Sequence, residues 1–130
     1  MRLTRFWALL AFGVLPADYA SAQAPRFEVV VPAATRQAPL TGRLVLVVAK
    51  RETPEPRLTV SPSGPALFAV DLEQQPADRP AVIDGGALGY PRPLAELAPG
   101  DYFVQAVINV YEEARRGDGQ RIWVQFNDGR

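Results

Sequence analysis

Runs of apolar residues separated by clusters of proline, glycine and polar residues make up most of the chain from residue 27 onward. The runs are short, carry many β-branched and aromatic side chains, and end at turn-forming residues, which favours strands over helices. The segments expected to form strands are residues 27–31, 42–49, 57–61, 66–72, 81–84, 100–111 and 121–126. Residues 93–98 (PLAELA) have the pattern of a helical turn. The chain is therefore predicted to be all-β.

The composition of individual strands indicates where each one lies. Residues 42–49 (GRLVLVVA) are apolar at both odd and even positions, as in a strand buried on both faces. Residues 57–61 are flanked by prolines, which favours a sheet edge. Residues 115–119 (RRGDG) predict a hairpin loop with a glycine in the left-handed conformation. About seven short strands with turns between them predict an immunoglobulin-like β-sandwich, and a partly closed barrel is the alternative.

A tyrosine begins the longest predicted strand. Residues 97–102 (LAPGDY) place a Pro-Gly turn just before Tyr102. The side chain of Tyr102 can then point inward and send its hydroxyl back to the preceding loop. This arrangement resembles the tyrosine corner of immunoglobulin-like sandwiches, so we expect Tyr102 to have a structural role.

The two faces of the longest strand differ in character. The even-numbered positions all suit a core: Tyr102, Val104, Ala106, Ile108 and Val110. The odd-numbered positions mix apolar side chains with two amides, as on a partly covered surface. If the neighbours of Trp123 point inward, the outer face carries an exposed patch of Phe103, Val107, Tyr111 and Trp123, which predicts an interface. The alternative is that a loop or another strand covers these residues.

The first 22 residues have the features of a secretory signal peptide. Arg2 and Arg5 precede an apolar run at residues 6–15, and residues 20–22 (ASA) fit the small-x-small cleavage pattern. The run is about half the roughly 20 residues that a membrane-spanning helix needs. We therefore expect residues 1–22 to be removed and residues 23–130 to form one domain, secreted or periplasmic in a bacterium and without a membrane association after cleavage.

Composition restricts the chemistry that this domain can perform. The sequence contains neither histidine nor cysteine, which excludes Ser–His–Asp triads, thiol nucleophiles, disulfides and zinc sites of the usual ligands. The 14 basic and 14 acidic side chains balance, so a nucleic-acid partner is not expected. No cofactor and no catalytic, cofactor-binding or metal-binding residue is predicted.

Carboxylates are the remaining side chains that could bind a metal ion or act in catalysis. Asp71 and Glu73 share one strand face at a spacing that could serve calcium, but we expect them to mark a solvated strand end. A small hydrolase that uses two carboxylates, as glycosidases do, would draw on Asp71, Asp84, Glu112 and Glu113. Two of these groups would have to converge across a cleft, which a small sandwich rarely provides.

Several short segments, in their order and spacing, resemble one known family. They are residues 26–29 (RFEV), 39–44 (PLTGRL), 68–71 (FAVD), 88–91 (LGYP), 97–106 (LAPGDYFVQA) and 109–111 (NVY). Together they resemble the N-terminal domain of secreted bacterial proteins classed as esterases, in which this domain precedes an α/β-hydrolase domain similar to enterochelin esterases. The resemblance implies a β-sandwich accessory domain, with the catalytic serine and histidine in the later hydrolase domain.

The resemblance leads to a set of functional expectations. The sequence stops at Arg130, where members of the family continue into the hydrolase, so the chain is either a truncated product or a stand-alone domain. A non-catalytic accessory domain would dock on an α/β-hydrolase domain or another protein, or bind the polymeric or glycosylated substrate of that enzyme. A stand-alone periplasmic binding protein is the alternative, and a small carboxylate-based hydrolase is the third.

Overall fold

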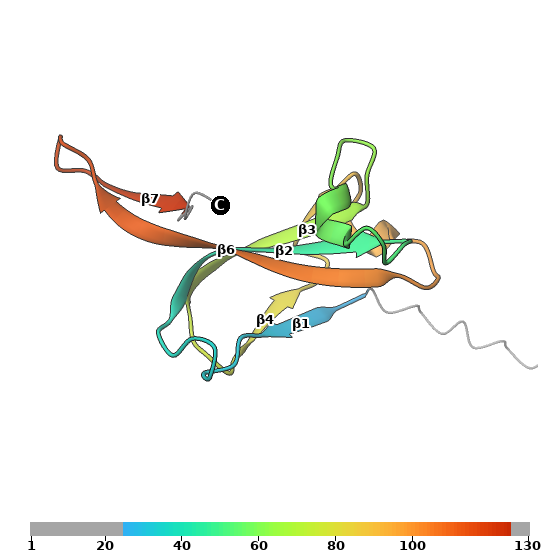
Figure 1. Cartoon of the computed structure of the whole chain (residues 1–130), viewed down its shortest axis with the longest axis horizontal. Coiled ribbons are helices and arrows are strands. Elements are labelled where there is room, and N and C mark those ends of the chain that lie inside the picture. The colour runs from blue at the N-terminus through green and yellow to red at the C-terminus, as the bar shows by residue number, and fades with distance from the viewer. Residues whose placement is uncertain (1–24, 126–130) are drawn as a thin grey trace, which may run out of the picture.

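The computed structural model describes residues 25–125, which form two antiparallel sheets packed face to face (Figure 1). The predicted signal peptide, residues 1–22, and the last residue of the final predicted strand, Phe126, lie outside the described residues. The strands are β1 (Phe27–Val30), β2 (Leu40–Ala49), β3 (Ala66–Gln75), β4 (Pro80–Ile83), β5 (Leu88–Tyr90), β6 (Phe103–Arg115) and β7 (Arg121–Gln125). The predicted all-β sandwich is confirmed.

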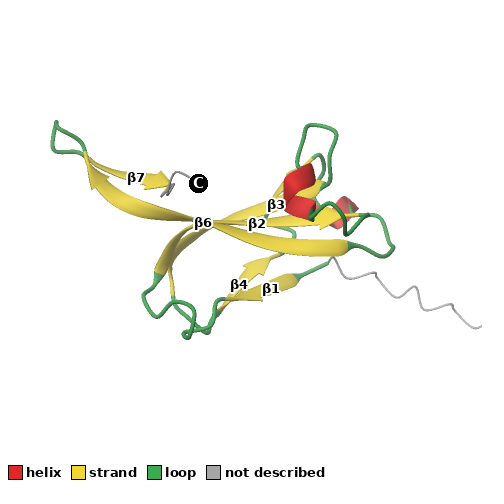
Figure 2. Ribbon diagram, viewed as in Figure 1, coloured by secondary structure: helices red, strands yellow, loops and turns green. Residues whose placement is uncertain are grey.

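The two sheets differ in width. The larger sheet has the strand order β5-β3-β2-β6-β7, and the smaller one pairs β1 with β4. The small sheet lies against one face of the large sheet, as Figure 2 shows. Apolar side chains from both sheets, and one from the segment between β5 and β6, form the core: Leu40, Leu44, Leu46, Val48, Phe68, Leu72, Ala81, Ile83 and Leu94. This single core accounts for the sandwich, because each sheet buries its apolar face against the other.

The middle strand of the large sheet is β2. It pairs with β3 on one side and with β6 on the other. Leu46, Val47 and Val48 are all buried, although their side chains point to alternate faces. The prediction that this segment is buried on both faces is confirmed, since a second layer of chain also covers the side away from the core.

The segment that covers this outer face of β2 is where the sequence prediction is most clearly wrong. Residues 57–61 were expected to form an edge strand, but the chain forms a 3₁₀-helix, η1, at Pro56–Thr59. Pro56 occupies a first helical position, where its fixed φ angle suits a helix, and Leu58 N–H bonds to the Glu55 carbonyl. The prolines therefore start a tight turn here instead of marking a sheet edge.

Two further short elements complete the sandwich. A second 3₁₀-helix, η2 (Leu94–Glu96), confirms the helical turn predicted at residues 93–98. The strand β5 was not predicted, because three residues are too few to show an alternating pattern. It pairs with β3 through Gly89 and Phe68, and a Cβ on Gly89 would lie 2.4 Å from the Arg92 carbonyl oxygen. Glycine is thus required for the chain to double back at this point.

The longest strand, β6, forms part of the sandwich with its first half and part of a hairpin with its second half. It pairs with β2 from Phe103 to Val110 and with β7 from Tyr111 to Arg115. Its second half and β7 therefore form a two-stranded ribbon that projects from the sandwich (Figure 1). Gly119, in the loop of this ribbon, has a φ of +84°, which confirms the left-handed glycine predicted in the hairpin.

Tyr102 precedes β6 and packs against the core. Its hydroxyl donates a hydrogen bond of 2.7 Å to the Ala98 carbonyl, four residues upstream. The Nζ of Lys50 lies 3.6 Å from the centre of the Tyr102 ring, a cation–π contact. The ring and hydroxyl together fix the loop that leads into β6.

Candidate functional site

A cleft of about 470 Å³ lies where the ribbon leaves the sandwich, on the face of the large sheet that points away from the core. Its volume falls within the range of roughly 300–1,000 Å³ that is common for small-molecule sites. Four segments supply the lining residues: Thr41, Gly42, Arg43, Asp71, Leu72, Glu73, Gln74, Tyr111 and Trp123. The cleft therefore joins the ends of β2 and β3 to the base of the ribbon.

Trp123 and Tyr111 provide the aromatic part of the cleft. Trp123 lies opposite Glu113 in the β6–β7 register, and Tyr111 lies two residues before Glu113 on β6. Because opposite residues of an antiparallel pair share a face, both rings are on the same side of the sheet. Trp123 remains 54% exposed, although an indole ring of this size is usually well covered. Such an exposed ring beside a concave surface is typical of a binding site.

Arg43 and Asp71 form the polar floor of the cleft. They lie opposite each other on β2 and β3, and Arg43 donates from Nε to Oδ1 at 2.7 Å and from Nη2 to Oδ2 at 3.1 Å. These hydrogen bonds, with the attraction between the charges, hold the pKa of Asp71 below its usual value and raise the pKa of Arg43. Two parallel hydrogen bonds between the planar guanidinium and carboxylate groups fix the orientation of both side chains.

A β-bulge lies next to this pair. Glu73 and Gln74 of β3 together face Thr41 alone of β2, because the register shifts between Leu40 and Gly42. Gln74 has a φ of +46°, which is an uncommon conformation for a residue other than glycine. The Oγ1 of Thr41 accepts hydrogen bonds from the backbone N–H of Gln74 at 3.2 Å and from its Nε2 at 3.0 Å. Bulges and strained residues of this kind concentrate at functional sites.

Gly42 sets the close approach of strands beneath the cleft. A Cβ at this position would lie 2.2 Å from the backbone oxygen of Asn109 on β6. A larger residue would therefore separate β2 from β6 and displace Arg43, the next residue along. The glycine allows the floor of the cleft and the base of the ribbon to meet.

The predicted interface residues do share one face. Phe103 is 45% exposed at the start of β6, Val107 and Tyr111 are partly buried, and Trp123 is the most exposed of the four. They do not form one continuous patch, because the chain around η1 occupies the outer face at Gln105, between Phe103 and Val107. Only Tyr111 and Trp123 enter the cleft.

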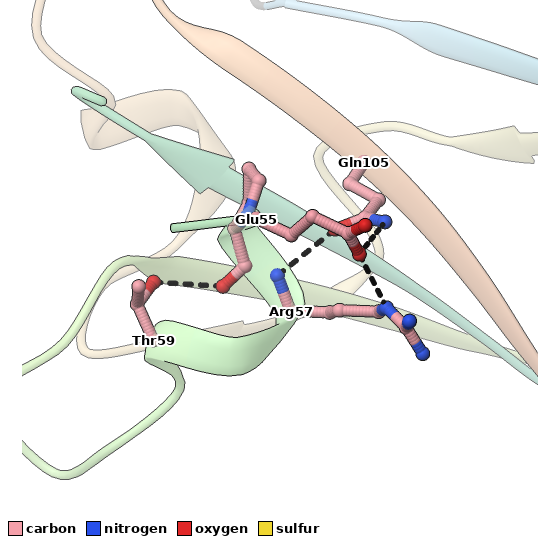
Figure 3. Close-up of polar contacts among 5 residues, drawn as sticks. Glu55, Arg57, Thr59 and Gln105 are labelled. Carbon is pink, nitrogen blue, oxygen red and sulfur yellow. Dashed lines mark hydrogen bonds and ion pairs between the residues drawn. The ribbon is translucent and has the colours of Figure 1, made fainter. Parts of the chain in front are cut away.

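The cover at Gln105 is a small polar cluster, drawn in Figure 3. The backbone N–H of Arg57 donates to the Oε1 of Gln105 at 2.9 Å, and the side chain of Arg57 donates to Glu55 at 2.8 Å. The bond from Arg57, followed by that from Gln105, lowers the pKa of Glu55. Thr59 closes η1 by donating its hydroxyl to the Pro56 carbonyl at 2.7 Å (Figure 3). These contacts explain why one amide interrupts an apolar face.

The opposite face of β6 is less buried than its sequence predicts. Tyr102, Ile108 and Val110 pack against the core, but Val104 is 44% exposed and Ala106 is also exposed. The expectation that all five positions are core residues is wrong at these two. The physical reason is the width of the small sheet, since two strands do not cover the whole face of five.

The remaining predicted carboxylates do not converge on the cleft. Asp84 accepts a hydrogen bond from the backbone N–H of Gly86, and Glu113 forms an ion pair with Arg121 on the ribbon. Glu112 lies opposite Val124, on the other face of the ribbon from Trp123. Within residues 25–125, no group of three or more acidic side chains is placed to hold a metal ion.

Sequence reasoning did not identify Thr41, Arg43 or Gln74 as site residues. A usable signal was present, because Arg43 is the single charge of β2 and Asp71 is the first charge after the apolar run at residues 66–70 of β3. Charges of opposite sign in such strands gain most when they pair across the sheet. The bulge at Gln74 had no comparable signal, since it depends on the register of two strands.

Comparison with known proteins finds no family model, no curated protein and no solved structure that matches the chain. Among the described residues, no helix is long and apolar enough to cross a membrane. What the fold and the cleft define is a class: an all-β sandwich with a mixed aromatic and polar surface cleft. Any assignment of function therefore depends on the chemistry of that cleft.

Proposed function

We propose that the chain is a non-catalytic, secreted accessory domain that binds its target through the cleft at Trp123. The exposure of Trp123 beside Tyr111 is the observation that carries this proposal. Aromatic side chains that remain open in a concave surface gain free energy mainly when a ligand or partner covers them. The paired charges of Arg43 and Asp71 in the same cleft would orient a ligand, as the few polar groups of a binding pocket do.

The protonation and placement of the acidic side chains favour binding over catalysis. A carboxylate mechanism needs one group that stays protonated and another that is ionised near neutral pH. Asp71 is held ionised by Arg43, and Glu73 projects from the same strand as Asp71, so the two do not face each other across the cleft. With neither histidine nor cysteine in the sequence, the commonest activating base and the thiol nucleophile are also missing.

The target that fits the family resemblance is an α/β-hydrolase domain or the substrate of that enzyme. The domain would dock on an α/β-hydrolase domain, or hold the polymeric or glycosylated substrate of that enzyme. Secretion is supported by the signal-peptide pattern of residues 1–22. The alternative is a stand-alone periplasmic binding protein that uses the same cleft for an unrelated partner.

The first test examines the exposure of Trp123 in the native protein. The chain has two tryptophans, and Trp7 lies in the predicted signal peptide, so Trp7→Phe leaves Trp123 as the reporter whether or not residues 1–22 are retained. We expect red-shifted emission that acrylamide quenches readily, because the ring is open to water. Blue-shifted emission that resists quenching would show that Trp123 is covered and would remove the basis of the proposal.

A second test separates binding from turnover. The purified chain is assayed on a panel of esters and glycosides, and no turnover is expected. Turnover that is abolished by Asp71→Asn or Glu73→Gln would establish the carboxylate hydrolase in place of the accessory domain. Turnover that survives these substitutions and the corresponding amide substitutions of Asp84, Glu112 and Glu113 would indicate a contaminating enzyme and would leave the proposal standing.

A further inference from the structure

The chemistry of the cleft allows its ligand class to be narrowed. We infer that the cleft binds a neutral oligosaccharide, an inference that rests on the proposed binding function of the same site. The juxtaposition that supports it is a pair of aromatic rings, Tyr111 and Trp123, in one cleft with a fixed ion pair, Arg43 and Asp71. A pyranose ring has the matching character, because its C–H face is apolar and its edge carries hydroxyl groups.

The aromatic part suits stacking against a sugar face. Tyr111 and Trp123 lie on one side of the sheet and both line the cleft, so their rings offer apolar surface within one concavity. Covering an aromatic side chain removes a large apolar area from water without requiring the ligand to be wholly apolar. A sugar satisfies this condition, since its hydroxyl groups remain at the rim of the stacked ring.

The charge of the cleft argues against an anionic ligand. Among residues 25–125, Arg43 is the one cationic residue of the lining; it already gives two hydrogen bonds to Asp71, and Glu73 adds a second carboxylate. The lining that these residues provide therefore carries one more negative than positive charge at neutral pH. A phosphate, a carboxylate or a nucleic acid would be repelled, whereas a neutral polyol meets no such penalty.

The hydrogen-bonding groups are arranged for hydroxyls. An ionised carboxylate has about four acceptor positions, and Arg43 uses two of those on Asp71. The Nε2 of Gln74 is held by Thr41, which fixes the amide and leaves its carbonyl oxygen as a further acceptor in the cleft lining. Neighbouring hydroxyls on a sugar present donors at the spacing that one carboxylate can accept. These groups are oriented before the ligand arrives, so little ordering entropy is lost on binding.

The openness of the cleft favours a chain over a single small molecule. The side chains of Arg43 and Asp71 are 41% and 60% exposed although they form the floor. A site that encloses a small ligand usually buries most of the ligand surface. An open cleft instead suits one internal unit of an oligosaccharide, with the neighbouring units left in solvent on either side.

The experiment uses the full chain with Trp7→Phe and soluble oligosaccharides of defined class. The neutral probes are cello-, xylo-, manno- and N-acetylchito-oligosaccharides, and the anionic comparator is an oligogalacturonate. Binding is followed by Trp123 fluorescence and by amide NMR shifts. We expect at least one neutral probe to bind saturably, to shift the emission toward the blue, and to move the amide signals of Arg43, Asp71 and Gln74.

Variants decide whether the cleft is responsible. Trp123→Ala should weaken binding by about tenfold or more, as loss of a central aromatic contact does, and Trp123→Phe should weaken it less. Phe103→Ala is the matched control, because the exposed ring of Phe103 lies on the same face as Trp123 but outside the cleft. The affinity of this variant for the oligosaccharide should be unchanged. Circular dichroism checks that each variant is folded.

The possible outcomes separate the inference from the proposed function. Failure of every neutral probe at millimolar concentration, a preference for oligogalacturonate, or binding that survives Trp123→Ala would overturn the saccharide inference. If no neutral probe binds but the Trp123 emission is red-shifted and quenchable, the proposal that the domain docks on a protein still stands. Binding followed by cleavage of the oligosaccharide would support the ligand class and overturn the non-catalytic function.

Discussion

Arg43 on β2 and Asp71 on β3 are joined by two hydrogen bonds, from Nε to Oδ1 and from Nη2 to Oδ2, on the solvent-facing side of the large sheet. Arg43 is the single charge of β2, Asp71 shares β3 with Glu73, and the pair lines the same cleft as Tyr111 and Trp123. The pair thus links the geometry of the sheet to the electrostatics of the cleft.

This pair should be visible in the pH titration of Asp71. Its pKa lies below the usual 3.8, mainly because of the hydrogen bonds from Arg43. A lowered folded-state pKa means that the pair stabilises the protein above pH 3.8, and that this contribution is lost as the pH falls through the folded-state pKa. Carboxyl ¹³C NMR should show this pKa returning toward 3.8 in Arg43→Gln. The shift should also shrink in 1 M NaCl, because both groups are exposed. Equal pKa values in the two proteins would contradict the assignment.

The strained backbone at Gln74 predicts an unusual order of stabilities. Gln74→Ala and Gln74→Gly both remove the amide that bonds to Thr41, but only glycine adopts a φ near +46° without a steric penalty. We therefore expect Gln74→Gly to be more stable than Gln74→Ala by about 1 kcal/mol. Urea unfolding measures the difference. If the alanine variant is the more stable, Gln74 is not strained in solution.

Gly42 should tolerate no side chain. In Gly42→Ala the new Cβ would meet the Asn109 oxygen at 2.2 Å, both strands being central to the sheet, so we expect a loss of at least about 2 kcal/mol. Gly85→Ala is the control, because a Cβ there meets no atom within 4 Å. The two variants are compared by thermal and urea unfolding. Similar stabilities would show that β2 and β6 can separate without cost.

The hydroxyl of Tyr102 should contribute to stability. Tyr102→Phe removes the bond to the Ala98 carbonyl and retains the ring, so we expect a loss of about 1 kcal/mol in urea unfolding. Tyr111→Phe serves as the comparison, since the Tyr111 hydroxyl makes no hydrogen bond within residues 25–125, and the stability of this variant should be nearly unchanged. Equal effects of the two substitutions would remove the special role of Tyr102 in holding the loop before β6.

The larger features of the fold were predictable because they depend on local patterns. The apolar run at residues 42–49 indicated a strand buried on both faces, and the RRGDG segment indicated a hairpin with a left-handed glycine. Each signal lies within a few residues of the feature that it predicts. The 3₁₀-helix η1 was missed because prolines at residues 54 and 56 suit both a sheet edge and the first turn of a helix.

The candidate site was only half predictable. Alternation along β6 placed Tyr111 and Trp123 on one face, since that inference needs only the pairing of one hairpin. The pairing of Arg43 with Asp71 depends on the register between β2 and β3, and the bulge at Gln74 shifts that register by one residue. No local pattern in the sequence specifies such a shift.

The central strand β2 acquires its two partners at very different points along the chain. β3 follows after one connecting segment, whereas β6 begins only at Phe103, and pairing over so long a separation forms slowly. Until β6 arrives, one edge of an apolar, valine-rich strand with the single charge of Arg43 is free to pair with the same segment of another molecule. Refolding yield should therefore fall as protein concentration rises, because docking of β6 competes with intermolecular aggregation through β2.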